Sequence, residues 1–125
     1  MFIKDKSRYG FEDTVRIIKN FLKEKNFEIF AEIDHRKNAI KAGLDMQNET
    51  VLIFGSPIAG THLMEENPEI GIELPAKLLI YSTNDDVYLF YRNPEELIDT
   101  FKIMEYRDVL KKLKSLFDNI INVVS

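Results

Sequence analysis

The chain has 125 residues, of which 45% are hydrophobic and 30% charged, and its formal net charge is −4. This length suffices for one hydrophobic core, so we expect a single domain over residues 1–125, with the composition of a globular rather than a disordered protein. The absence of cysteine excludes disulfides and thiolate chemistry, the negative charge disfavours nucleic acid, and the lack of a long apolar segment predicts a cytoplasmic protein with no membrane association.

The first third of the chain predicts two strands separated by a helix. A short strand is expected at residues 2–3. Apolar residues at helical spacing follow Gly10 and predict a helix that ends near Asn26, a residue that tolerates the left-handed conformation. Residues 27–34 alternate between apolar and other side chains, which predicts a strand with one face formed by Phe27, Ile29, Ala31 and Ile33.

The middle of the chain predicts two capped helices on either side of a buried strand. Asp34 is expected to cap a short helix over residues 35–42. Residues 51–54 form a continuous apolar run, as expected for a strand that is buried on both faces or central in its sheet. Ser56 is then expected to cap a helix that begins with Pro57 and ends before Pro68.

The last third predicts a hairpin and two helices. Residues 77–83 and 87–91 are expected to pair as strands across a polar turn. A short helix is expected to start at Asn93-Pro94, and apolar residues at helical spacing from Tyr106 to Val124 predict a long final helix. The order β-α-β-α-β-α-β-β-α-α indicates an α+β fold with a mostly antiparallel sheet and helices packed on it.

Several segments together resemble family 302 of the domains of unknown function: Phe30–His35, Ala42–Leu44, Val51–Pro57, Gly60-Thr61, Leu63-Met64 and Leu74-Pro75. The resemblance covers nearly the whole chain up to Tyr91. It implies a TATA-binding-protein-like fold, with a curved antiparallel sheet and two main helices packed on one face, and it implies no activity. Two positions depart from the family pattern, Ser56 where asparagine is usual and His62 where a small residue is frequent, so no role is carried over to His62.

The segment from Gly55 to Thr61 is the first candidate site. The start of a helix presents unpaired backbone N–H groups and a partial positive charge, which attract anions. Gly55 allows a ligand to approach the backbone, and Ser56, Gly60 and Thr61 complete the turn. The structural alternative, which we favour, is that Ser56 only caps the helix and Gly60 allows tight packing. The stretch from Ala42 to Ala76 contains no lysine or arginine, so the nearby carboxylates would repel an anion.

Asp34 and His35 form the second candidate site. A carboxylate beside a histidine can orient the ring and raise its pKa, as acid–base chemistry requires. The alternative is that Asp34 caps the following helix and His35 is exposed in its first turn.

Two further clusters have weaker patterns. His62 lies near Glu65, Glu66 and Glu69 and could hold a divalent metal, but one histidine without diagnostic spacing favours a solvated acidic face, and we predict no metal centre. Lys111, Lys112 and Lys114 with Arg107 are expected to form the solvated side of the final helix rather than a nucleic-acid site.

These features leave three functions open, and the sequence specifies no cofactor or substrate. The first is a small-ligand binding module, whose pocket would be lined by Asp34, His35, the Ser56 turn, Tyr81 and Tyr91. The second is a structural or interaction protein that acts as a homodimer through the apolar stripe of the final helix. The third, ranked last, is an enzyme that uses His35 as an acid or base.

Overall fold

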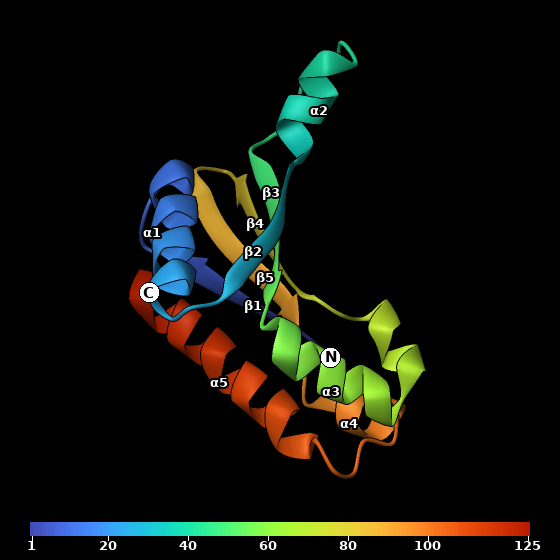
Figure 1. The fold of residues 1–125 in the computed structure, drawn as a ribbon. Coiled ribbons are helices and arrows are strands. Elements are labelled where there is room, and N and C mark those ends of the chain that lie inside the picture. Colours follow the sequence, from blue (N-terminus) through green and yellow to red (C-terminus); the bar gives the residue numbers. More distant parts are fainter.

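The computed structural model describes all residues from 1 to 125 and consists of one five-stranded sheet with helices (Figure 1). Its strands are β1 (Phe2–Ser7), β2 (Glu28–Asp34), β3 (Glu49–Gly55), β4 (Ala76–Thr83) and β5 (Asp86–Arg92). Its helices are α1 (Phe11–Glu24), α2 (His35–Lys41), α3 (Pro57–Glu66), α4 (Glu96–Thr100) and α5 (Arg107–Val124), with a 3₁₀ turn η1 (Pro68–Ile72). The strands are ordered β1-β5-β4-β3-β2 and every neighbouring pair is antiparallel, which confirms the predicted α+β fold.

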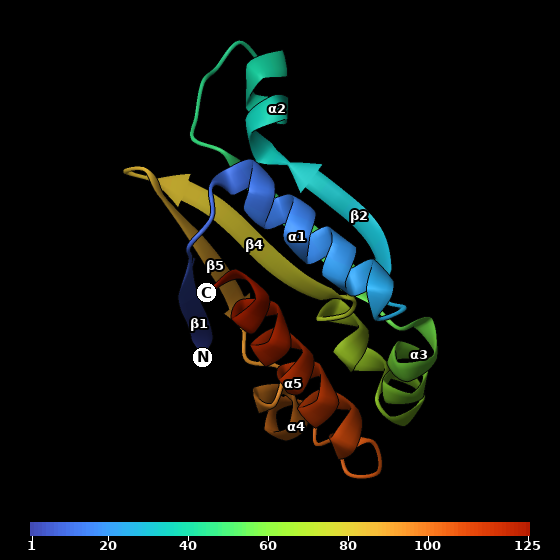
Figure 2. The same cartoon turned by 90° about the vertical axis from the view of Figure 1, so that its left-hand side faces the viewer.

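The two long helices, α1 and α5, cover one face of the sheet (Figure 2). Alternate residues of the central strands point toward them and form the main core, including the fully buried Leu52, Phe54, Leu78, Ile80 and Leu89. The intervening residues therefore point to the opposite side, which we call the open face. The cross-strand pairing places Val51, Leu79, Phe90 and Lys4 in one row across that face.

The strand β2 differs from its prediction, because it contains a β-bulge between Ile29 and Ala31. Ile29 pairs with Phe54 and packs against the core, whereas Ile33 pairs with Val51 on the open face. The extra residue, Phe30, reverses the alternation, so the four apolar side chains do not share one face. Beyond the bulge, Glu32 is directed toward α1, where its carboxylate contacts the Lys19 ammonium at 2.6 Å.

A second, smaller apolar cluster holds the far end of the molecule together. It joins α3, η1, α4 and α5 through the buried residues Leu63, Ile70, Leu97, Ile103 and Leu110. The Glu66 carboxylate accepts hydrogen bonds from the backbone N–H groups of Met104 (2.5 Å) and Tyr106 (3.0 Å), so it fixes the loop that leads into α5. These amide donors lower the pKa of Glu66, that of Met104 most strongly.

The long final helix starts where predicted, but its apolar stripe is not left uncovered. Leu110 lies in the small cluster, and Leu116, Phe117, Ile120 and Val124 lie in the main core. The observation that suggested a homodimer through this helix is therefore removed. The shorter helix before it begins at Glu96 rather than at Asn93, because the Asn93 side chain accepts a hydrogen bond from the Glu95 N–H and forms a turn instead.

The helix α2 and the following segment project away from the rest of the molecule (Figures 1 and 2). The Asp34 carboxylate accepts a hydrogen bond from the Lys37 N–H at 2.9 Å, which confirms the predicted cap. None of the side chains of α2 is buried.

No helix in the structure combines the length and the apolar character that crossing a membrane requires.

Candidate functional site

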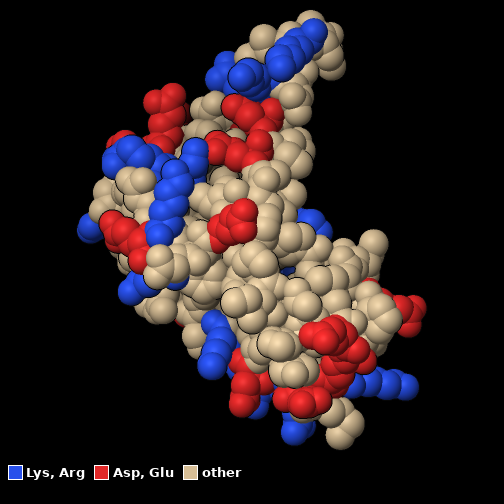
Figure 3. Space-filling view, in the orientation of Figure 1, with Lys and Arg blue, Asp and Glu red and all other residues tan.

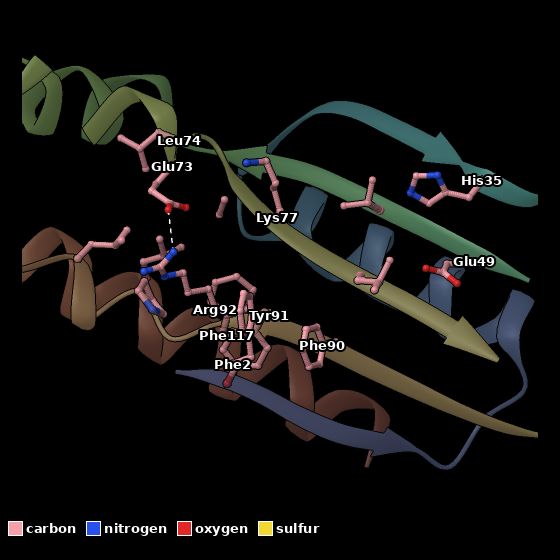
Figure 4. Close-up of a pocket in the computed structure, with 16 residues that line it drawn as sticks. Phe2, His35, Glu49, Glu73, Leu74, Lys77, Phe90, Tyr91, Arg92 and Phe117 are labelled. Carbon is pink, nitrogen blue, oxygen red and sulfur yellow. Dashed lines mark hydrogen bonds and ion pairs between the residues drawn. The ribbon is translucent and has the colours of Figure 1, made fainter. Parts of the chain in front are cut away.

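A cleft opens in the sheet where β4 and β5 separate (Figure 4). The β3–β4 pairing continues to Phe54 and Ala76, and the β1–β5 pairing continues to Phe2 and Arg92. The β4–β5 pairing, however, ends at Leu79 and Phe90. The two strands thus diverge over the first residues of β4 and the last residues of β5, and the divergence leaves room between them.

The cleft has a volume of about 460 Å³ and is mainly apolar. Val51, Leu79, Phe2 and Phe90 line it on the open face. Leu74, Ala76, Pro94, Leu97, Leu113 and Phe117 line it where it extends between the strands toward α5. Ligand sites in proteins usually measure ~300–1,000 Å³ and combine such apolar walls with a few polar groups, so the cleft has suitable dimensions for a small molecule.

Arg92 provides the polar group at the mouth of the cleft. Its Nη1 lies 2.9 Å from Glu73 Oε1, and its Nε lies 2.6 Å from Glu96 Oε1. All three side chains are partly buried, so water and dissolved salt screen these ion pairs less than they would screen fully exposed ones. The guanidinium is therefore held in place beside the cleft by two carboxylates.

Lys77 is the second cation of the cleft, and it has no carboxylate partner. It lies on the open side of β4, and no oxygen of Asp or Glu lies within ion-pair distance of its ammonium. In Figure 4 its side chain extends from β4 toward the end of β3, away from β5. No carboxylate neutralises its charge.

His35 and Glu49 line the other end of the cleft (Figure 4). Glu49 Oε1 accepts a hydrogen bond from Gln47 Nε2 at 2.8 Å. His35 makes no side-chain hydrogen bond or ion pair, and the neighbouring Asp34 carboxylate is directed to the Lys37 N–H. The carboxylate–histidine pair considered from the sequence is not formed, since Asp34 acts as the helix cap.

Stacked aromatic rings support the walls of the cleft. Phe2 stacks on Phe90 with a centroid distance of 5.0 Å, and Tyr91 stacks on Phe117 at 4.2 Å. Burial raises the pKa of the Tyr91 hydroxyl, and the nearby Lys114 ammonium opposes that shift. Tyr91 belongs to the main core, so its ring forms part of a rigid wall.

The residues predicted to share one pocket lie at opposite ends of β3. Asp34 pairs with Thr50 at one end, whereas Gly55 pairs with Glu28 at the other. Five strand residues separate these positions by roughly 17 Å. Of the predicted lining, His35 and Tyr91 border the cleft, and Asp34, Ser56 and Tyr81 do not. The structure therefore does not bring the two candidate segments together in one pocket.

Both hydroxyl groups at the start of α3 form hydrogen bonds within the turn. Ser56 Oγ accepts a hydrogen bond from the Ala59 N–H at 3.4 Å, and Thr61 Oγ1 donates one to the Pro57 carbonyl at 2.7 Å. A Cβ atom at Gly60 would meet no other atom within 4 Å, so tight packing does not require glycine there. A Cβ atom at Gly55 would make ordinary contact with Phe30 and Pro75.

The acidic residues near His62 do not converge. Glu66 is occupied by the two backbone amides, while the His62 ring stacks on Tyr106 at 4.9 Å and lies 3.4 Å from Glu65. No group of three or more potential metal ligands exists in the chain. On α5, Lys111 and Lys112 are exposed, whereas Lys114 contacts Asp118 at 2.5 Å.

Apart from Tyr91, the cleft residues on β4 and β5 were missed by reasoning from the sequence. Lys77, Leu79, Phe90 and Arg92 all occupy the positions that alternate with core residues, and this alternation was the available signal. It could not reveal the cleft, since nothing in the strand pattern indicates where two paired strands separate.

A family model and a solved structure match nearly the whole chain. The family model described as "Domain of unknown function DUF302" matches residues 3–123. A crystal structure of an uncharacterized conserved DUF302 protein from Bacillus stearothermophilus superposes with a TM-score of 0.86 and covers 99% of this chain and 98% of that one. The two sequences are 17% identical, so this likeness concerns the fold alone.

Curated relatives match over part of their length. "Fluoride-specific ion channel FluC 1" of Brucella suis biovar 1 (strain 1330) is 29% identical over 107 residues, which are 85% of this chain and 42% of that protein. "Fluoride-specific ion channel FluC 2" of Brucella melitensis biotype 1 shows the same identity, with 40% of its length covered. The chain thus spans less than half of the curated relatives it matches.

Proposed function

The chain belongs to the DUF302 family, and for this member we propose a role as a binding module for a small, mainly apolar molecule that carries one acidic group. The cleft between β4 and β5 is the observation that supports this proposal. Its volume of about 460 Å³ and its apolar lining suit a ligand of that kind. The ion-channel activity named for the Brucella proteins is not part of the proposal, because the match covers less than half of each.

The charges around the cleft favour an acidic group over a basic one. Lys77 has no carboxylate partner, so its charge is available without breaking an existing ion pair. Arg92 lies at the mouth, and an incoming carboxylate could take the place of Glu73 against its guanidinium, where planar, bidentate contacts are favourable. The net charge of −4 argues against nucleic acid as the occupant.

An enzyme that uses His35 has less support. His35 borders the cleft, but no carboxylate orients its ring, and general acid–base catalysis depends on such positioning. Binding without chemistry is therefore the function that the geometry favours.

The proposal can be tested with matched probes that differ only in charge. Decanoate and phenylpropionate would be titrated against decanol and phenylpropanol, with binding followed by calorimetry and by backbone amide NMR shifts. We expect the acids to bind more tightly and to shift residues of β4 and β5. Lys77→Gln should weaken the acids about tenfold and leave the alcohols unchanged, because one charge-assisted contact to the ligand contributes on the order of 1.4 kcal/mol.

Two variants complete the design. Lys4→Gln is the matched control, because Lys4 lies on the same face of the sheet but rests over the Tyr88 ring, 4.3 Å from its centroid, outside the cleft. Leu79→Trp fills the apolar wall and should abolish binding of acids and alcohols alike. Shifts that map elsewhere, or no binding of any probe at millimolar concentration, would reject the proposal.

A further inference from the structure

We propose that two copies of this chain associate reciprocally, each placing its projecting arm (residues 35–46, which include α2) against the acidic tip (residues 57–73, which include α3 and η1) of the other. This interface is separate from the cleft and does not depend on a ligand.

The arm has apolar side chains that its own molecule leaves largely exposed. No residue of α2 is buried, and Ile40 and Leu44 remain 55% and 67% exposed. A helix of seven residues is marginal by itself in water, and most helices depend on packing of an apolar side for their stability. The arm therefore has only a few contacts of its own to support a helix of this length.

The arm is also basic. Arg36, Lys37 and Lys41 lie on α2, which carries no acidic residue. Arg36 contacts Asp45 at 3.5 Å within the arm, whereas Lys37 and Lys41 are exposed and have no carboxylate partner. In Figure 3 these blue side chains gather on the projecting helix.

The acidic tip has the opposite charge and its own uncovered apolar residues. Residues 57–73 contain no lysine or arginine, and Glu65 and Glu69 are exposed there. Ile58 and Ile72 are 73% and 78% exposed. Ile58 and Glu65 are seven residues apart, so they lie on the same side of α3. The tip thus combines apolar and negative groups, as the arm combines apolar and positive ones.

A second copy is the partner that these two surfaces fit. They lie at opposite ends of one molecule, so they cannot meet within it (Figures 1 and 3). A two-fold arrangement brings each arm to the tip of the other chain, uses both contacts twice and closes without extending further. Complementary charge determines the register of such an interface more than its affinity, and the apolar residues provide the buried area.

Charge reversal tests this pairing directly. Sedimentation velocity would be run on the wild-type chain, on Lys37→Glu/Lys41→Glu (the arm variant), and on Glu65→Lys/Glu69→Lys (the tip variant). We expect a wild-type dimer, and a loss of at least tenfold in dimer affinity for either variant alone. An equal mixture of the two variants should restore the dimer, because both reversed contacts then have opposite charges again.

The matched control reverses two lysines elsewhere. Lys111→Glu/Lys112→Glu changes the charge by the same amount on the exposed side of α5 and should leave the dimer intact. A wild-type monomer at millimolar concentration would overturn the proposal, as would variants that still dimerise or a mixture that stays monomeric. Open-ended higher oligomers of the wild-type chain would overturn the reciprocal arrangement. All the substituted side chains are exposed, and circular dichroism would verify that each variant is folded.

Discussion

Replacing Phe117 tests most directly whether the inner wall of the cleft is tightly packed. Its side chain lines the cleft and is only 2% exposed. It stacks on Tyr91 with nearly parallel rings, 4.2 Å between centroids, and it meets Phe54 edge to face at 5.6 Å. Phe117→Ala would therefore remove two aromatic contacts and join an empty volume to the cleft.

The expected cost follows from these contacts. The substitution removes about six buried carbons, and each buried methylene is worth ~0.8 kcal/mol, which gives about 5 kcal/mol before any relaxation. Each aromatic pair adds ~0.5–1.5 kcal/mol. Water entering from the cleft and movement of the neighbouring side chains offset part of this loss. We expect the free energy of unfolding to fall by about 3–5 kcal/mol, the range found for buried phenylalanine.

Urea unfolding followed by circular dichroism measures this change, with Phe2→Ala as the matched control. Phe2 also lines the cleft and stacks on another ring, but it is 58% exposed, so its loss should cost less than about 1 kcal/mol. A natural domain has a stability of ~5–15 kcal/mol, so both variants should remain measurable. Equal costs for the two variants, or a cost below about 1 kcal/mol for Phe117→Ala, would show that the inner wall of the cleft is not packed as described.

Three other outcomes are expected. The backbone amides of Met104 and Tyr106 lower the pKa of Glu66. The stability that its carboxylate contributes is therefore present at neutral pH and is lost as the pH falls through the lowered pKa. Glu66→Gln should flatten this acid dependence of the urea midpoint. Because burial raises the pKa of Tyr91, the chain should lose stability as the pH rises above the ordinary tyrosine value, and Tyr91→Phe should reduce that loss in alkaline unfolding curves. Asp34→Ala should destabilise α2 by about 1 kcal/mol, because it removes the helix cap. Amide hydrogen exchange should then become roughly fivefold faster in the arm alone. A uniform increase of the exchange rate over the whole chain would contradict the independence of that segment.

Local chemistry made many elements predictable from the sequence. Asp34 and Ser56 cap their helices as expected, since a short acceptor side chain satisfies backbone N–H groups wherever a helix begins. Asn26 adopts a φ of 64° at the end of the first helix, as its short polar side chain allows. The candidate sites were harder to predict, because Asp34 and Ser56 proved to be separated by most of the length of a strand.

The sequence by itself determined the order of the main helices and strands and the caps at Asp34 and Ser56, because these depend on near neighbours and on the period of the apolar pattern. Only the tertiary structure decided which long helices share one face, where the bulge at Phe30 reverses β2, and where β4 and β5 separate. Those features arise from strand pairing between distant segments. Pairing beyond Leu79 and Phe90 is lost even though the strand pattern continues on both sides, and the cleft exists for that reason.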